Sequence, residues 1–535
     1  MADQPFKSTD PLWWKSAVLY QIYPRSFADS NNDGIGDLPG VIEHLDHFAW
    51  LGIDGIWLSP ITVSPNADWG YDVADYCNVD PSLGTIADVD RLVFEAASRN
   101  VRVLIDLVPN HTSGEHAWFK QARSSRDNPY RDYYVWQDPR PDGSFPNNWV
   151  SSFGGPTWTM DDDTGQWYLH NFLPGQPDLN WWNPKVRDEF DQILRFWFDR
   201  GISGFRIDVA HSIVKDALLR DNPPATEDDP FVMQMFGQRP FYNENQPEVH
   251  EVLRRWRKIG DSYDPPRVLV GETSVDKIEA LVTFYGSDDD ELHLAFNFPF
   301  IEAPFEAEAM SKIAALTTEL LPPYAWPVWV GSNHDVSRFS TRWAEGDKRK
   351  IRLAQMMLLS MRGTPFLFEG DEIGLEDADP TEEQLRDPVG IRFWPYYKGR
   401  DPERSPMPWT AAENGGFTAP GVETWLPMTD PAVCNVADQR ADPGSVLNYL
   451  RDLIIARREN PEFVLGTSSP VDAPSGCWAW RRGETFTVAL NMSDSDSEIP
   501  GVTGNVLICT DTSRNGDAVS GTLSLAPWTG AIVKS

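Results

Sequence analysis

Cysteine is scarce in this chain of 535 residues, which has only four. Cys77, Cys434, Cys477 and Cys509 are scattered, and their spacing matches no metal-binding or redox motif. Such cysteines are typical of reduced thiols in a cytoplasmic protein, although two disulfides remain possible. Residues 1–7 also lack the charged-then-apolar pattern of a secretory signal. The sequence therefore predicts a cytoplasmic location.

Basic residues are also few, because 46 Lys and Arg face 80 Asp and Glu, which gives a net charge of −34. A chain this acidic repels nucleic acids and anionic membrane surfaces, so we expect neither as a partner. No apolar run approaches the length of a membrane span, about 18 residues. A neutral or cationic ligand is favoured, and adaptation to salt is a second explanation for the acidity.

Aromatic residues are plentiful instead, with 23 Trp and 15 Tyr. Their flat faces suit sugar rings or nucleobases, although packing alone can also use them.

Short apolar segments alternate with amphipathic ones along much of the chain, and this alternation is typical of a parallel sheet with crossover helices. Helical periodicity covers residues 41–51, 88–98, 187–199 and 446–457. Eight strands are expected, which predicts a closed (β/α)8 TIM barrel. They are residues 18–22, 55–58, 101–108, 201–210, 268–270, 293–297, 328–330 and 366–368.

The alternation of strands and helices is interrupted twice and ends before the C-terminal part of the chain. Residues 109–183 are too long for a plain loop, so they are expected to form an inserted domain. A second irregular stretch covers about 371–430. The barrel is thus assigned to residues 1–108 and 184–465, and short alternating strands predict a C-terminal antiparallel β-domain at 466–535.

The fourth expected strand carries Arg206 and Asp208 near its C-terminal end. Alternate strand residues point to one face, so the two side chains should lie together. An Asp beside an Arg is expected to stay ionised, as a carboxylate nucleophile requires. A buried ion pair that braces the strand would have the same sequence.

Other strands also end in polar residues, and in a barrel these ends converge on one face. Glu272 follows the fifth strand, and Asp335 follows the seventh. Because Glu272 follows an apolar strand, desolvation is expected to raise its pKa. Two carboxylates with separated pKa values are the usual pair of a glycosidase.

Four motifs together resemble glycoside hydrolase family 13, the α-amylase superfamily. They are residues 106–111 (DLVPNH), 204–208 (GFRID), 271–272 (GE) and 333–335 (NHD). Within this family, residues 176–181 (QPDLNW) and 404–409 (RSPMPW) are similar to α-glucosidases and oligo-1,6-glucosidases.

The resemblance implies a role for each of the three carboxylates. Asp208 would form a covalent glucosyl intermediate, Glu272 would act as acid and then base, and Asp335 would bind the sugar 2- and 3-hydroxyls. Two displacements at one carbon would retain the α configuration. His111, His334 and Arg206 would hydrogen-bond the sugar.

The resemblance also implies a closed pocket. Tyr71 would stack on the glucose ring, and Asp68 would pair with Arg404 at the closed end, which would release single glucose units. Phe172 would line the same pocket, although it could instead belong to the core of the inserted domain.

The acidic loop at residues 29–37 has oxygen ligands at calcium-loop spacing. Gly40 stands where an EF-hand requires Glu, so the loop instead resembles the calcium site of oligo-1,6-glucosidases. Asp29, Asn31, Asp33, the Ile35 carbonyl and Asp37 would be the ligands of a structural Ca²⁺. Mg²⁺ is the other candidate metal, and a turn without metal is the alternative.

We expect a retaining exo-α-glucosidase that acts on short α-glucosides, as a monomer or homodimer. An oligo-1,6-glucosidase or a trehalose synthase or sucrose isomerase relative is the alternative. In relatives, Val at the position of Val209 tends to accompany α-1,6 activity, but the following Ala210-His211 departs from their pattern. A non-enzymatic relative, similar to transporter heavy chains, would have a membrane span and lack intact catalytic carboxylates.

Overall fold

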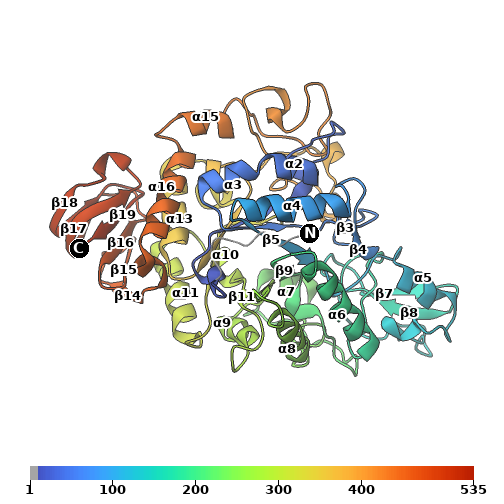
Figure 1. Cartoon of the computed structure of the whole chain (residues 1–535). Coiled ribbons are helices and arrows are strands. Elements are labelled where there is room, and N and C mark those ends of the chain that lie inside the picture. Colours follow the sequence, from blue (N-terminus) through green and yellow to red (C-terminus); the bar gives the residue numbers. More distant parts are fainter. Residues whose placement is uncertain (1–9) are drawn as a thin grey trace.

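The computed structural model describes residues 10–535, and its centre is a sheet of eight parallel strands. Neighbouring strands pair in the order β11-β10-β9-β5-β2-β1-β13-β12, so the sheet curls into a nearly closed barrel (Figure 1). The TIM barrel predicted from the sequence is confirmed. The strands are β1 (Leu19–Ile22), β2 (Gly55–Leu58), β5 (Arg102–Leu107), β9 (Gly204–Ile207), β10 (Val268–Gly271), β11 (Leu294–Ala295), β12 (Val328–Val330) and β13 (Thr364–Phe368).

Helices surround the barrel, and side chains cap the N-termini of several of them. Thr85 and Asp88 form a reciprocal capping box at the start of α4, and Asn183 caps α6. The longer helices are α4 (Ile86–Ser98), α5 (Ala117–Ser124), α6 (Pro184–Phe198), α8 (Val249–Gly260), α11 (Ala307–Leu320), α13 (Lys348–Ser360) and α16 (Val446–Glu459). The shorter ones are α1 (Pro24–Phe27), α2 (Leu38–Glu43), α3 (Leu45–Leu51), α7 (Phe231–Phe236), α9 (Ile278–Leu281), α10 (Phe298–Ile301), α12 (Phe339–Arg342), α14 (Pro388–Phe393), α15 (Val436–Ala441) and α17 (Pro461–Leu465).

The helical structure expected at residues 41–51 is confirmed, with Gly52 as its C-cap, but it is divided between two helices. The segment forms α2 and α3, which meet at His44, where the backbone leaves the helical region at φ −101° and ψ 7°. The His44 ring pairs with the Gly40 carbonyl at 2.9 Å, so a side chain takes the place of the next backbone turn.

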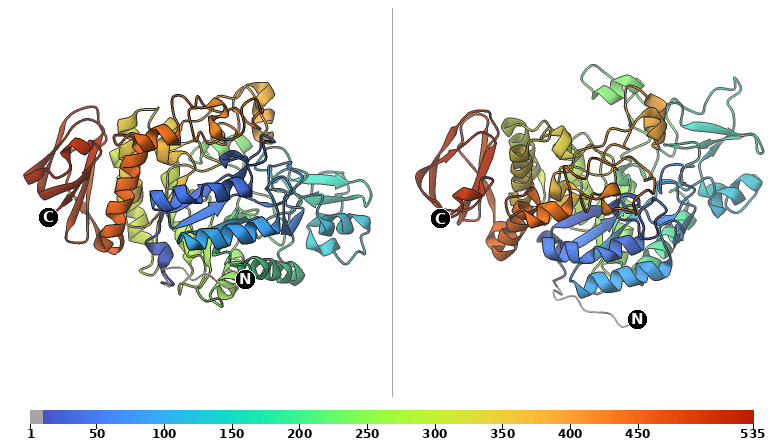
Figure 2. Two further views of the ribbon diagram at one scale, coloured as in Figure 1. Left: turned by 45° about the horizontal axis from the view of Figure 1, so that its top comes forward. Right: turned by 90° about the horizontal axis from the view of Figure 1, so that it is seen from above.

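Two smaller sheets lie at opposite ends of the molecule, with the barrel between them (Figure 2). Near one end, β6 (Trp136–Gln137), β8 (Gln166–Leu169) and β7 (Trp158–Asp161) form an antiparallel sheet within the stretch that follows β5. At the other end, the C-terminal sheet has the order β14-β15-β16-β19-β17-β18 and is antiparallel, as predicted. Its strands are β14 (Ser468–Val471), β15 (Cys477–Arg482), β16 (Phe486–Asn491), β17 (Ser497–Cys509), β18 (Ala518–Leu525) and β19 (Thr529–Lys534), and a short pair, β3 (Thr62–Val63) with β4 (Asp75–Val79), follows β2.

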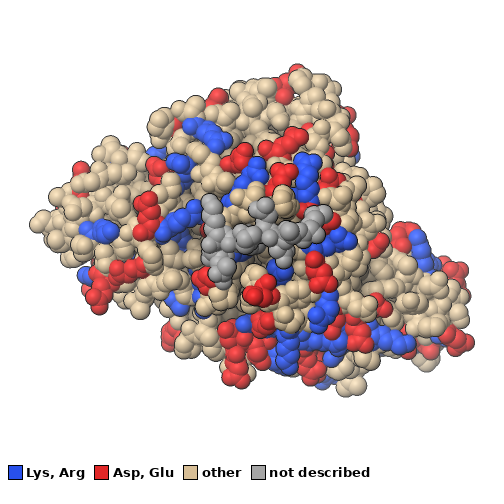
Figure 3. All heavy atoms as spheres, in the orientation of Figure 1, with Lys and Arg blue, Asp and Glu red and all other residues tan. Residues whose placement is uncertain are grey.

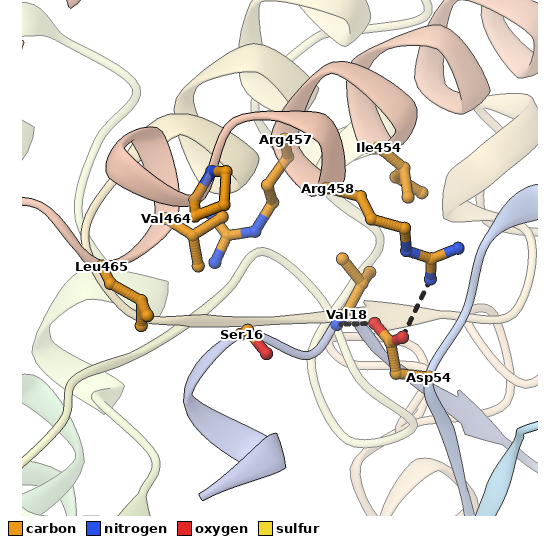
Figure 4. A pocket seen from close by; sticks show the side chains of 9 residues that line it. Ser16, Val18, Asp54, Ile454, Arg457, Arg458, Val464 and Leu465 are labelled. Carbon is orange, nitrogen blue, oxygen red and sulfur yellow. Dashed lines mark hydrogen bonds and ion pairs between the residues drawn. The ribbon is translucent and has the colours of Figure 1, made fainter. Parts of the chain in front are cut away.

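The N-terminal ends of β1 and β2 are held to α16 by an ion pair. Asp54 accepts hydrogen bonds from the Val18 N–H at 2.9 Å and from Arg458 at 2.8 Å, beside a cavity of about 260 Å³ (Figure 4). This ion pair lies at the N-terminal end of the barrel, opposite to the strand termini that carry the polar residues.

The surface charges, the cysteines and the lengths of the helices can be compared with what the composition predicted. Acidic and basic side chains are interspersed over the face shown in Figure 3. All four cysteines are free thiols. Within residues 10–535, no helix is long and apolar enough to cross a membrane.

His116 makes the stability of the fold depend on pH. Its ring caps α5 by accepting the Trp118 N–H at 3.1 Å, and burial lowers its pKa to about 4. Below the unfolded pKa, about 6.5, the unfolded chain binds a proton that the folded chain excludes, so stability falls by up to about 1.4 kcal/mol per pH unit down to about pH 4.

We expect the His116→Asn variant, which keeps a capping oxygen but cannot titrate, to lose less Tm than the parent between pH 7 and pH 5. Thermal unfolding at both pH values measures this difference, and an equal loss in the two proteins would contradict it.

Candidate active site

The polar residues predicted to converge do so at the C-terminal ends of the barrel strands. Arg206 lies in β9, and Asp208 follows that strand directly. Glu272 follows β10, and Asp335 lies beyond β12. Arg206, Asp208 and Glu272 are buried. The Asp335 side chain is 27% exposed.

One guanidinium group joins three of the carboxylates. Arg206 Nη1 donates to Asp208 Oδ1 at 2.7 Å and to Asp106 Oδ1 at 2.8 Å. Its Nη2 donates to Glu272 Oε2 at 2.7 Å. The side chain is only 1% exposed, so these charge-assisted bonds operate away from water.

The expectation that Asp208 has a low pKa is wrong. Burial raises its pKa well above the ordinary range, and the Glu272 and Asp106 carboxylates reinforce the shift, although Arg206 opposes it. Burial likewise raises the pKa of Asp106 to about 7. A single positive charge cannot neutralise three buried carboxylates, so the cluster retains a proton near neutral pH.

Asp335 has the opposite environment. Its Oδ1 accepts from Arg404 Nη2 at 2.7 Å and lies 3.3 Å from Arg400 Nη1. Burial alone would raise its pKa, but the His334 ring and the two guanidinium groups outweigh burial and hold it well below the usual range. Asp335 is therefore a fixed negative charge.

The family resemblance implied that Asp68 pairs with Arg404, and this expectation is wrong. Asp68 Oδ1 accepts from Arg400 Nη2 at 2.7 Å, and the same nitrogen lies 2.7 Å from Asp387. Its Oδ2 accepts from Gln176 at 3.0 Å. Arg400 and Arg404 thus both contact Asp335, but Arg400 is the one that binds Asp68.

Tyr71 and His334 lie against each other, with ring centroids 5.3 Å apart and planes 11° apart. The Tyr71 hydroxyl contacts the His334 Nε2 and lies 3.1 Å from Asp106 Oδ2. Burial keeps the pKa of His334 well below its usual range. Gln21 donates to Nδ1 at 2.7 Å, which leaves the proton of the neutral ring on Nε2, 3.2 Å from Asp335.

His111 and Phe172 are brought to the same place by different segments. His111 Nε2 lies 2.8 Å from the Tyr71 carbonyl, and burial lowers the His111 pKa. The Phe172 ring lies 5.1 Å from the His111 ring and is only partly buried. Phe172 therefore lies beside His111, and its role in lining a sugar pocket stays a prediction.

Val209, directly after Asp208, adopts a left-handed conformation with φ 36° and ψ 49°. This is costly for a β-branched residue. The turn aims the Val209 N–H at Glu272 Oε2, 2.8 Å away. Glu272 is thus fixed by two donors, one from Arg206 and one from this strained turn.

Comparison with known proteins identifies the family. The catalytic-domain model of α-amylase matches residues 21–466. The chain belongs to the α-amylase family, glycoside hydrolase family 13.

Relatives in this family match nearly the whole chain. A probable alpha-glucosidase from Rhizobium meliloti is 41% identical, and the match covers 92% of each chain. An oligo-1,6-glucosidase from Parageobacillus thermoglucosidasius is 38% identical over 85% of each.

Solved structures agree with this assignment. An alpha-glucosyl transfer enzyme, XgtA, superposes with a TM-score of 0.90 at 39% identity, over 98% of this chain and 99% of its own. The trehalulose synthase MutB from Pseudomonas mesoacidophila has a TM-score of 0.87 at 33% identity, with the same coverage.

The loop that resembles the family's calcium site is a series of tight side-chain turns. Asp29, Asn31 and Asp33 each accept the N–H two residues further on, at 2.9 to 3.0 Å. Asp37 caps α2, and the Ile35 carbonyl accepts no hydrogen bond from a described residue. These oxygens are ligands that Ca²⁺ accepts. No group of three or more His, Cys, Asp or Glu in residues 10–535 is arranged around a metal position, so the metal remains a prediction.

Sequence reasoning missed three residues of the site, namely Asp106, Arg400 and Asp387. Asp106 opens one of the four family motifs and lies in a strand, so alternation could have placed it beside Arg206. Arg400 and Asp387 belong to the irregular stretch after β13, where no periodicity indicates which side chains meet.

Proposed function

We propose that this glycoside hydrolase is a retaining, exo-acting α-glucosidase that releases α-glucose from the non-reducing end of short α-glucosides such as maltose or isomaltose. The observation that carries the proposal is the Arg206 guanidinium, which holds Asp208 and Glu272 together with Asp335 nearby. An ion pair with a purely structural role would need one carboxylate beside Arg206, whereas three carboxylates converge on it.

The first step would form a covalent glucosyl ester. Asp208 would attack the anomeric carbon while the glycosidic C–O bond breaks, and Glu272 would donate its proton to the leaving oxygen. This step requires a proton on Glu272, and the cluster that Arg206 joins could supply one, because a single guanidinium charge faces three buried carboxylates. Asp335, which stays ionised, would bind the sugar hydroxyls and stabilise positive charge on the ring.

In the second step, Glu272 would take a proton from water, and the water oxygen would displace Asp208 from the anomeric carbon. Two inversions restore the α configuration. The strained Val209 turn supports this step, because its N–H and Arg206 hold one oxygen of Glu272 in place.

The polar pairs beyond Asp335 favour the release of single glucose units. Arg400 links Asp68 to Asp387, while Arg404 Nη1 is buried and has no hydrogen-bond partner among the described residues. Such a donor is suited to a sugar hydroxyl at the closed end of the pocket. Tyr71, His111, His334 and Phe172 would form the remaining walls around the glucose ring.

Transfer of glucose to another sugar is the second candidate. Two structural neighbours, an alpha-glucosyl transfer enzyme and a trehalulose synthase, favour it, and the oligo-1,6-glucosidase relative supports hydrolysis of α-1,6 bonds. The chemistry up to the covalent intermediate is shared, so the acceptor decides between them.

Product analysis separates these candidates. We expect the parent protein to release glucose from maltose, isomaltose or both, and Asp208→Asn to reduce turnover by about a thousandfold or more while unfolding at the parent's Tm. Isomerised disaccharide without free glucose from maltose, sucrose or trehalose would favour the second candidate. Undiminished turnover in Asp208→Asn would refute the mechanism.

We also propose that the loop at residues 29–37 binds one structural Ca²⁺, through Asp29, Asn31, Asp33, Asp37 and the Ile35 carbonyl. Binding to the folded state alone would stabilise it by about 2.7 kcal/mol at a hundredfold excess over Kd. Mg²⁺, which demands near-ideal octahedral geometry and usually keeps several waters, would suit a loop of five protein ligands less well.

Chelation by EDTA should therefore lower the Tm of the parent by a few degrees, and added Ca²⁺ should restore it. The Asp33→Asn variant should respond less. Asp142→Asn, which alters a similar exposed turn elsewhere, should respond like the parent. A Tm indifferent to chelation would refute the site.

The four free thiols support a cytoplasmic location, where such thiols remain reduced. We propose a monomer or homodimer, and sedimentation analysis distinguishes these two states.

A further inference from the structure

A groove of about 600 Å³ lies outside the barrel wall, between α11 and the first two strands of the C-terminal sheet, β14 and β15. These elements are neighbours in Figure 1. Met361 and Arg362, which line the groove, directly precede β13. The groove therefore lies toward the end of the barrel opposite to Asp208 and Glu272.

Tryptophan forms the floor of this groove. Trp478 and Trp480 are two residues apart on β15 and so project from the same face of the strand. Their ring centroids are 4.5 Å apart. Trp480 is buried, whereas Trp478 is only partly buried and leaves part of its ring for a ligand. Trp329, from β12, completes the apolar lining.

The rim carries charges of both signs in equal number. Lys312 and Glu319 come from α11, Arg362 from the segment before β13, and Asp472 from the end of β14. None of the four forms an ion pair or side-chain hydrogen bond with another described residue, although Arg362 stacks on the Trp326 ring at 4.2 Å. Donors and acceptors are thus both available, with no net preference for a charged ligand.

The edge of the C-terminal sheet argues against a peptide in the groove. β14 is the edge strand, and its Pro470 lacks the N–H that an added strand would pair with. A purely apolar ligand would also desolvate the charged rim without replacing its hydrogen bonds. A ligand with an apolar face and many hydroxyl groups satisfies both the floor and the rim.

We propose that this groove is a second carbohydrate-binding site, in which the Trp478 ring stacks on a glucose unit of a short gluco-oligosaccharide and the rim side chains bond its hydroxyls. The identity of the sugar rests on the proposed function. The site would hold substrate or product away from the catalytic carboxylates without turning it over.

Calorimetric titration with maltotriose tests this site in the full-length Asp208→Asn protein, which should not consume the ligand. Two molecules should bind per chain. Adding Trp478→Ala should abolish one of the two binding events, whereas Trp478→Phe, which keeps an aromatic face, should weaken that event by about tenfold or less. Trp50→Ala, which removes a partly buried tryptophan from α3 outside the groove, should leave both.

Glu319→Gln guards against a folding artefact, because the side chain is exposed on the rim and its loss should weaken the same event several-fold without altering the Tm. Binding of a single molecule before Trp478 is changed, or of two molecules afterwards, would overturn the proposal.

The catalytic function is tested separately. In the otherwise unsubstituted protein, Trp478→Ala should leave kcat/KM for maltose and isomaltose within about twofold of the parent. If the parent releases no glucose from either sugar, the proposed function fails. If it does so but binds one maltotriose per chain, only the second site fails.

Discussion

The site depends on one buried guanidinium group surrounded by more negative charge than it can neutralise. Arg206 is 1% exposed and bonds to three carboxylates from three adjacent strands. Removing the arginine would leave several buried charges uncompensated, which is among the most destabilising changes a protein can undergo. The arrangement also keeps a proton within the cluster near neutral pH, because full ionisation of all three carboxylates would leave a net negative charge away from water. Acid catalysis and nucleophilic attack both need this divided protonation.

Around Asp335 the balance of charge is reversed, because positive groups outnumber the carboxylate they surround. Arg400 and Arg404 supply two positive charges around Asp335, and their other donors bind Asp68, Asp387 and the His334 carbonyl. The pKa of Asp335 is therefore held well below its usual range, while burial raises the pKa of Asp208 and Asp106 in the Arg206 cluster. The site thus contains carboxyl groups with lowered pKa and others with raised pKa. The difference depends on how many guanidinium groups lie beside each one.

The sequence predicts the barrel well because its strands are short apolar runs bounded by helices, and burial on both faces leaves a clear pattern. Strand alternation also places Arg206 beside Asp208, which the 2.7 Å contact confirms. The pKa of Asp208 was predicted in the wrong direction, because burial of the carboxyl raises it more than the neighbouring arginine lowers it, and Glu272 and Asp106 from neighbouring strands add to the rise.

The pairing of Asp68 was also wrong for a physical reason. Arg400 and Arg404 lie four residues apart in a segment without helical or strand periodicity, so spacing does not indicate which one turns toward Asp68. The buried Asp387 settles the matter, since its two oxygens accept from Nε and Nη2 of Arg400 and so orient the guanidinium, whose Nη2 also donates to Asp68. Long-range packing of this kind leaves no local signal.

The central claim is that Asp208, held by Arg206, becomes covalently bonded to glucose during turnover. Mass spectrometry of the protein after reaction with a fluorinated α-glucosyl fluoride, which slows the second step, tests this claim most directly. Our account predicts one fluoroglucosyl unit per chain, attached to the peptide that contains Asp208. A unit attached to Glu272 or Asp335, or complete turnover of the reagent with no covalent adduct and an inverted product, would contradict it.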